Sequence, residues 1–498
     1  VLQSAPAVVC VEGSRQLPTG CSPRLRLPTP TRRSLPQLRH YFPICFEVPC
    51  QLYCDVMTAR CCMALAAIMG MMGLMMQPAA AFISISDGKF VDEECREFTW
   101  VGANTWRMLE AQAGLGGTDG KAVENLMQQA AALNITVLRV FATGVTPELP
   151  LQLEPGKYNQ VALEALDGVM AAAADNDIRV TLVLARNWDG PDNKAAYASW
   201  NGLESPDDFF TSPAAQKGFQ EHMQFMAERV NSVNGRVYKE DPAIFSWNLM
   251  NEPRYFDNNT ACQSQTGTCT NAMQTWIEVS AAALKAADPN HLVAIGSEGF
   301  WGTNSPKLDQ NPSNGDWAAQ TGQNFVENTQ AKGIDYAAIH VWPDNWNVPT
   351  SYLTEWVTQH MEDARTLGVP LVVEEFGKNV TGHTEQELAK ARNPVFQAIF
   401  DLLEESIAND DVLKGAQYWM WDPLLVNERS EGWADLNQDQ VLPTESTMTD
   451  IIAPAAANAA MNKPVVRGCT PKVAPTAPTA APSDAAATST AGRKLMMA

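Results

Sequence analysis

The stretch AIFSWNLM, residues 243–250, is a short and mostly apolar run that ends directly at the polar sequence NEPR, residues 251–254. A run of this length that gives way to polar residues is typical of a buried strand in a parallel sheet. The stretch LVVEEFG, residues 371–377, has the same design. Each run therefore delivers a glutamate, Glu252 or Glu375, at the carboxyl end of a strand.

Similar apolar runs recur along the chain, and amphipathic stretches with helical spacing separate them. Strands that alternate with helices predict parallel βα units, and eight such units within residues 82–462 favour a closed (β/α)8 TIM barrel over an open sheet. The expected strands are Phe98–Ala103, Thr136–Phe141, Arg179–Ala185, Ala243–Met250, His291–Gly296, Asp335–His340, Leu371–Glu375 and Ala416–Trp421. The expected helices are Ala122–Leu133, Ala162–Asp175, Ala214–Val230, Thr275–Ala287, Thr354–Leu367 and Glu385–Ser406.

The flanking segments differ from this domain in composition. Residues 57–81 contain Arg60, the apolar run CCMALAAIMGMMGLMM and the small residues PAAA, which is the pattern of a cleaved secretory signal peptide. Residues 1–56 are rich in Pro, Arg and Cys without periodicity, and we expect either a disordered extension or an upstream translation artefact ahead of a true start at Met57. Residues 463–498 become Ala, Pro and Thr-rich, a low-complexity tail.

The cysteines that remain after signal cleavage are even in number, as is usual in secreted proteins. They are Cys95, Cys262, Cys269 and Cys469. A local disulfide between Cys262 and Cys269 is expected across a polar loop, which leaves Cys95 and Cys469 as a second pair.

The composition narrows the range of partners. Of the 498 residues, 35 are Lys or Arg and 56 are Asp or Glu, which gives a net charge of −21. Such an acidic protein repels phosphate backbones, so nucleic acid is not an expected partner. The sequence has neither CxxC nor HExxH spacing, so no metal site is expected.

The polar and aromatic residues at other strand ends suit a carbohydrate substrate. Two carboxylates at one barrel mouth are what cleavage of a glycosidic bond requires, one as proton donor and one facing the anomeric carbon. If the two groups are about 5–5.5 Å apart, the second attacks directly and the configuration is retained. The residues expected to surround the substrate are Arg139, Trp188, Asn251, Arg254, His340, Trp342 and Trp419.

Asn-Glu-Pro after one strand and Glu-Phe-Gly after a later one resemble the motifs of glycoside hydrolase family 5, in the retaining clan A group. Residues 82–440 are most similar to its endo-β-1,4-mannanases, through LQLEPGKYNQVALEALD (151–167), NWD (187–189), residues 209–254, HVWPDNW (340–346) and LVVEEFG (371–377). The resemblance implies that Glu252 is the general acid/base and Glu375 the nucleophile. Glu374 is a rival nucleophile, but on an ideal strand it points to the opposite face.

The resemblance also implies roles for the surrounding residues. Asn251 would bind the substrate 2-hydroxyl, Arg139 would keep Glu375 ionised, and His340 would line the pocket. Trp419 would be the stacking platform for the sugar whose bond is broken, and Arg254 would bind sugars on the leaving-group side. Trp342 replaces a more usual Tyr, and its indole is expected to substitute only in part. Trp188 could equally pack against the rest of the domain or form part of a sugar-binding subsite.

The predicted function is therefore a secreted, monomeric hydrolase that cleaves β-1,4-mannosidic linkages in mannan, galactomannan and glucomannan by double displacement, without metal or cofactor. Its partner is a neutral polysaccharide, with no membrane association after signal cleavage. For this mechanism the pKa of Glu252 is expected to be raised and Glu375 to stay ionised. The alternatives are an endo-β-1,4-glucanase on the same scaffold and a carbohydrate-binding pseudoenzyme.

Overall fold

The structure, a computed structural model, describes residues 82–118, 121–255, 268–312, 317–380, 384–425, 439–461 and 463–472. The predicted extension, signal peptide and most of the tail lie outside these residues. So does the predicted Cys262–Cys269 pair, since neither cysteine has a described side chain. Within the described ranges, no helix combines the length and the apolar character needed to cross a bilayer.

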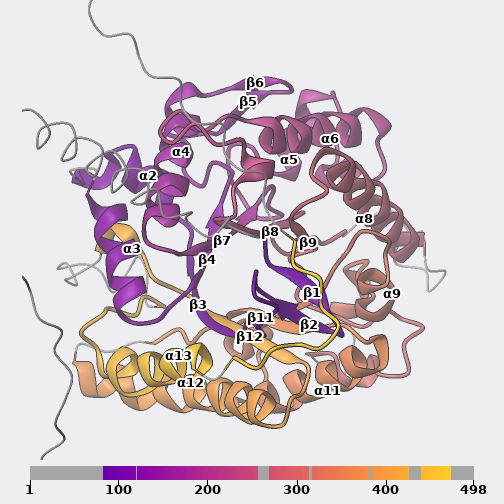
Figure 1. Ribbon diagram of the computed structural model, residues 1–498. Coiled ribbons are helices and arrows are strands. Elements are labelled where there is room, and N and C mark those ends of the chain that lie inside the picture. Colours follow the sequence, from indigo (N-terminus) through magenta and orange to yellow (C-terminus); the bar gives the residue numbers. More distant parts are fainter. Residues whose placement is uncertain are drawn as a thin grey trace, which may run out of the picture. The chain divides into compact units, whose positions relative to one another are not determined.

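A parallel barrel of eight strands forms the centre of this domain (Figure 1). Adjacent strands pair in the order β10-β11-β12-β3-β4-β7-β8-β9. Two backbone bonds link the last members of the row, Asp335 N to Val293 O at 2.9 Å and His340 N to Glu298 O at 3.2 Å, so the barrel is nearly closed. The strands are β3 (Trp100–Thr105), β4 (Val137–Phe141), β7 (Arg179–Val183), β8 (Ile244–Asn248), β9 (Leu292–Ala294), β10 (Ala337–Val341), β11 (Leu371–Phe376) and β12 (Leu413–Tyr418).

All eight predicted strands and all six predicted helices are confirmed, with ends displaced by a few residues. The helices surround the barrel and bury their apolar faces against it (Figure 1). Several begin where a side chain caps the first turn, as Asn159, Ser212 and Thr384 do. The longer helices are α3 (Ala122–Ala132), α4 (Gln160–Asp175), α6 (Pro213–Glu228), α8 (Thr268–Ala287), α11 (Tyr352–Leu367) and α12 (Glu385–Ala408).

Shorter elements fill the connections. The hairpin of β5 (Gln152–Glu154) and β6 (Lys157–Tyr158) precedes α4, and the one-turn helix α10 follows β10 directly. The shorter α-helices of the domain are α2 (Met108–Gln112), α5 (Lys194–Trp200), α9 (Phe325–Thr329), α10 (Pro343–Trp346) and α13 (Ala453–Ala460).

The N-terminal end of the barrel is closed by an aromatic plug. The hairpin of β1 (Ser84–Ser86) and β2 (Lys89–Val91) crosses this end in Figure 1 and inserts Phe90 between the strands. The Phe90 ring lies 5.1 Å from Trp100, 5.4 Å from Phe245 and 5.3 Å from Tyr336, measured between centroids. Phe90 is fully buried, so its ring fills the centre of this end of the barrel.

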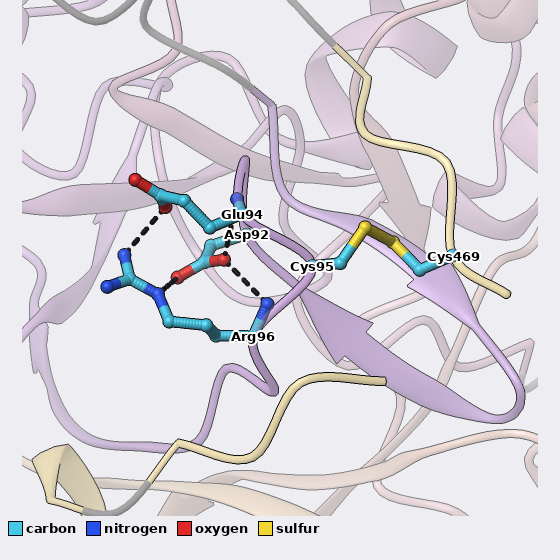
Figure 2. The surroundings of a disulfide bond; sticks show 5 residues. All are labelled: Asp92, Glu94, Cys95, Arg96 and Cys469. Carbon is cyan, nitrogen blue, oxygen red and sulfur yellow. Dashed lines mark hydrogen bonds and ion pairs between the residues drawn. A yellow bond between two sulfur atoms is a disulfide. The ribbon is translucent and has the colours of Figure 1, made fainter. Parts of the chain in front are cut away.

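The folded domain continues past residue 462, the end that the change in composition predicted for it. Residues 463–472 run along the hairpin, and Cys469 forms a disulfide with Cys95, as Figure 2 shows. Three backbone bonds fix the segment: Glu97 N to Pro464 O at 2.8 Å, Val466 N to Cys95 O at 2.8 Å, and Phe82 N to Lys472 O at 3.0 Å. The boundary at 462 was wrong because composition does not show that a polar strap is held by backbone bonding and a crosslink.

The turn that carries Cys95 is held by a neighbouring carboxylate. Asp92 accepts hydrogen bonds from the backbone N of Arg96 at 2.8 Å and of Glu94 at 3.0 Å (Figure 2). The Arg96 side chain bonds back to Asp92 at 2.9 Å. This local network supports the backbone of Cys95 at φ 58°, a conformation that residues other than glycine rarely adopt.

Candidate active site

Glu252 lies directly after β8, at the carboxyl end of the barrel. Its φ of 52° lies in the left-handed region, and its backbone N donates to Gly296 O at 2.7 Å. Only glycine fits at position 296, because a Cβ there would lie 2.5 Å from Met250 O. The strained backbone of Glu252 is thus held by a close approach of two strand ends, which aims its carboxylate at the barrel axis.

Glu375 lies in β11 and is fixed by Arg139 of β4. Arg139 Nη1 donates to Glu375 Oε1 at 2.5 Å, and the guanidinium is completely buried. Three amide oxygens accept its other hydrogens, those of Asn248 at 2.7 Å, Asn251 at 2.8 Å and Asn104 at 3.0 Å. The predicted role of Arg139 as the cation beside the nucleophile candidate matches this geometry.

The expected orientation of Glu374 is wrong. Its side chain also points into the barrel, where Oε1 accepts from Tyr336 OH at 2.9 Å and Asn248 Nδ2 at 3.0 Å. The pairing of β11 with β12 shifts register between Val373 and Phe376, and this irregularity breaks the alternation of an ideal strand. Glu374 is only 1% exposed and is absent from the residues that line the cleft, whereas Glu375 lines it, which favours Glu375 as the nucleophile candidate.

His340, at the end of β10, connects the two candidate catalytic carboxylates. Its Nδ1 lies 2.8 Å from Glu252 Oε1 and 3.5 Å from Glu375 Oε2. The ring is fully buried and lies behind the carboxylates, rather than lining the pocket as predicted. One oxygen of each carboxylate and a His340 nitrogen lie within 4.8 Å of one another, and this short separation favours direct attack by the second carboxylate.

The pKa values of the three groups depend on one another. Burial raises the pKa of Glu375, against the opposing effects of His340 and Arg139. Burial also acts to raise the pKa of Glu252, but the hydrogen bond and charge of His340, with Arg254 and Trp188, hold it at about 2. Burial lowers the pKa of His340, and the two carboxylates more than reverse this, so it is raised.

These directions contradict the expectation of a raised pKa for Glu252. The sequence shows an apolar, tryptophan-lined surrounding, which disfavours charge, but it does not show that His340 and Trp188 both donate to Glu252. The contacts with His340, Arg254 and Trp188 therefore favour the ionised form of Glu252 in the unliganded site.

A cleft of about 470 Å³ opens over the two glutamates. Trp188, whose role the sequence left open, belongs to it: the ring is 44% exposed and Nε1 donates to Glu252 Oε2 at 2.5 Å. The Arg254 guanidinium lies 4.9 Å from the Trp188 ring and 5.2 Å from that of Trp317. Glu298, buried beneath, accepts from Arg254 Nε at 2.5 Å. Arg254 thus lies on the Glu252 side, as predicted.

Trp342 and Trp419 line the cleft on the Glu375 side. Trp342 Nε1 points to Glu375 Oε2 at 3.4 Å, so the indole supplies the donor for which a tyrosine is more usual. The two rings lie 6.4 Å apart, nearly perpendicular. Gly377 of the Glu-Phe-Gly motif permits this packing, because a Cβ there would meet the Trp342 ring at 2.7 Å.

Several residues of the site were not predicted. Asn104 and Asn248 hold Arg139, and Glu298 holds Arg254. The two asparagines are polar residues inside apolar strands, and Glu298 follows the end of β9, so each had only a weak sequence signal. The cleft also includes Asn345 and Trp346 of α10, and Trp317 and Asp439 from the segments that connect the barrel elements.

Glu252, His340 and Glu375 are also near enough together to share a cation. Both oxygens of Glu252 already accept hydrogen bonds, from Trp188 and His340, and Glu375 Oε1 is bonded to Arg139. These hydrogen bonds leave few lone pairs free to bind a cation. That the protein uses no metal and no cofactor remains a prediction from the sequence.

The class of protein that this fold and this pair of glutamates define is the barrel glycoside hydrolases. Comparison with protein-family models identifies the family within this class: residues 80–442 match the one described as GH family 5 beta-mannosidase-like. The chain belongs to this family.

Individual relatives agree with this assignment. Mannan endo-1,4-beta-mannosidase 1 of Arabidopsis thaliana is 31% identical over 64% of this chain and 76% of its own length. Mannan endo-1,4-beta-mannosidase 4 of Oryza sativa subsp. japonica is 32% identical over 69% of this chain and 74% of its own length. The fold resembles that of the endo-beta-1,4-mannanase of Thermotoga petrophila, with a TM-score of 0.61 at 23% identity, covering 73% of this chain and 77% of the other.

Proposed function

We propose that the protein hydrolyses internal β-1,4-mannosidic bonds of mannan-type polysaccharides with retention of configuration. The observation that carries the proposal is the placement of Glu252 and Glu375 about one cleft, with Arg139 on one carboxylate and the leaving-group residues Trp188 and Arg254 beside the other. The names of the relatives favour mannan over cellulose as the substrate.

The geometry suggests how the steps proceed. Glu375 attacks the anomeric carbon, and Glu252 protonates the departing sugar oxygen, which leaves a covalent glycosyl ester. Glu252 then takes a proton from water, and this water releases the sugar from Glu375. Before the first step a proton must reach Glu252, and His340 Nδ1, 2.8 Å away, is the group positioned to deliver it.

The test is to compare wild type with Glu375→Gln on linear mannan, glucomannan and carboxymethyl cellulose, measuring released reducing ends. We expect release from mannan and glucomannan that the variant reduces by about 10⁴-fold or more. Release mainly from cellulose would replace the substrate, and no release from any of the three with intact binding would favour a pseudoenzyme. Retention is tested by using NMR to identify the anomer of the product that is released first.

We also propose that the protein is secreted after removal of residues 57–81, and acts as a monomer. The Cys95–Cys469 disulfide supports an oxidising compartment. Both catalytic candidates and the cleft come from one chain, which supports the monomer. N-terminal sequencing of the protein recovered from culture medium and its mass in solution test the two parts. An intact leader or a purely cellular product would contradict secretion.

A further inference from the structure

The carboxylate beneath the site, Glu374, has no part in the two-glutamate mechanism, although it is adjacent in sequence to Glu375 and equally buried. We propose that Glu374 is a positioning residue, which orients the amides of Asn248 and Asn104 so that their oxygens hold Arg139 against Glu375. The inference deepens the proposed function and depends on it for the role of Glu375.

The first contact runs through the Glu374 side chain. Its Oε1 accepts from Asn248 Nδ2 at 3.0 Å, and the Asn248 oxygen accepts from Arg139 Nε at 2.7 Å. Glu374 Oε1 accepts at this contact and a guanidinium only donates, so an amide between them fits in one orientation alone. A flipped Asn248 would direct its NH2 group at Arg139 and its oxygen at Glu374, which loses both bonds.

The second contact runs through the Glu374 backbone. Asn104 Nδ2 donates to Glu374 O at 2.8 Å, and Asn104 Oδ1 accepts from Arg139 Nη1 at 3.0 Å. The same reasoning fixes this amide, because a carbonyl oxygen also only accepts. Glu374 thus orients two of the three amides that surround the guanidinium, one with its side chain and one with its main chain.

A chain of buried hydroxyl groups on the side of Glu374 away from the cleft keeps its carboxylate in place. Tyr336 OH bonds to Glu374 Oε1 at 2.9 Å and to Ser246 Oγ at 2.9 Å, and Ser246 Oγ lies 3.1 Å from Thr181 Oγ1. All these side chains are buried, where each lost hydrogen bond costs more than at the surface. The network therefore passes from β7 through β8 and β11 to Arg139 on β4, without touching the cleft.

Two substitutions separate hydrogen bonding from charge. Glu374→Gln can keep both bonds on its oxygen, because Oε1 receives both donors and Oε2 has no partner among the described residues. Glu374→Leu removes the acceptor while leaving the backbone bond to Asn104. We expect Glu374→Gln to remain within about 3-fold of wild type in kcat, and Glu374→Leu to lose about 10- to 100-fold, as for one hydrogen bond involving a charged group.

The pH profile distinguishes positioning from simple destabilisation. Glu375 is faced by Arg139, His340 and Glu252, and of these Arg139 is the one that Glu374 acts upon. A displaced Arg139 lets the pKa of Glu375 rise, so in Glu374→Leu the acid limb of kcat/KM for mannohexaose moves to higher pH, with KM little changed. The matched control is Glu445→Leu, which removes another buried carboxylate bonded to an arginine, Arg392 at 2.7 Å.

NMR titration of ¹³C-labelled glutamate carboxyls measures the pKa of Glu375 directly and needs no turnover. The Glu375 signal is assigned by its loss in Glu375→Gln. If wild type does not cleave mannan but Glu374→Leu still raises the pKa of Glu375, the proposed substrate fails and the positioning role stands. If Glu374→Leu lowers only the melting temperature and leaves kcat and the Glu375 pKa as in wild type, or if Glu445→Leu shifts them equally, Glu374 has a structural role alone and the inference is overturned.

Discussion

The two ends of the barrel follow opposite designs. At the carboxyl ends of the strands, buried charges lie in contact, with Arg139, His340, Glu252 and Glu375 within one hydrogen-bonded group. At the amino ends, Phe90, Trp100, Phe245 and Tyr336 form an aromatic plug behind a disulfide. Burying charge costs free energy while burying aromatic surface releases it, so we infer that the second end stabilises the scaffold on which the first depends.

The comparison yields four predictions, which separate activity from stability. Of these four, the largest effect is expected from Glu252→Gln. Glutamine keeps the size of the side chain but cannot give up a proton, so kcat on mannan should fall by about 10²–10⁴-fold. The melting temperature should stay close to that of wild type. The loss should shrink for an aryl glycoside with a good leaving group, and an equal loss on both substrates would contradict the acid role.

Phe90→Ala tests the other end of the barrel. The substitution empties the centre of the aromatic plug, and we expect the free energy of unfolding to fall by about 3–5 kcal/mol. Denaturant unfolding followed by tryptophan fluorescence measures this. At a temperature where the variant is folded, kcat/KM should equal that of wild type; a large loss of activity would show that the two ends are coupled.

Removal of the crosslink should have a smaller effect in the same direction. The double variant Cys95→Ala/Cys469→Ala should lose about 2–4 kcal/mol of stability, because the unfolded chain is no longer constrained. Each single variant should lose about as much, since either one breaks the same bond. Thermal unfolding with and without reductant checks this: reductant should lower the stability of wild type by more than that of the double variant.

The smallest effect concerns pH. Glu375 must be ionised to attack, so kcat/KM falls as the pH drops through its pKa. The charge of His340 acts to lower that pKa, and its removal in His340→Gln should move the acid limb to higher pH. Profiles of kcat/KM on mannohexaose between pH 4 and 8 measure the shift. An acid limb at the wild-type position would mean that His340 carries no charge in the free enzyme.

Much of the catalytic end could be predicted from the sequence. The motifs that place Glu252 and Glu375 are local, and each lies just after an apolar run that can only be a buried strand. Arg139 and Trp342 could be placed for the same reason. The pKa order of the glutamates could not, because it depends on hydrogen bonds from His340 and Trp188, which are 88 and 64 residues from Glu252 in the sequence.

What the sequence by itself determined is the barrel, since strand and helix periods repeat along the chain and each unit buries one apolar face. It also determined the identity of the two catalytic candidates. Only the tertiary structure decided that Glu374 turns inward, because a register shift between β11 and β12 sets its direction. It likewise decided that residues 463–472 belong to the folded domain, because the backbone bonds and the disulfide that hold this segment come from residues more than 360 positions away in the sequence, as in the 374-residue separation of Cys95 and Cys469.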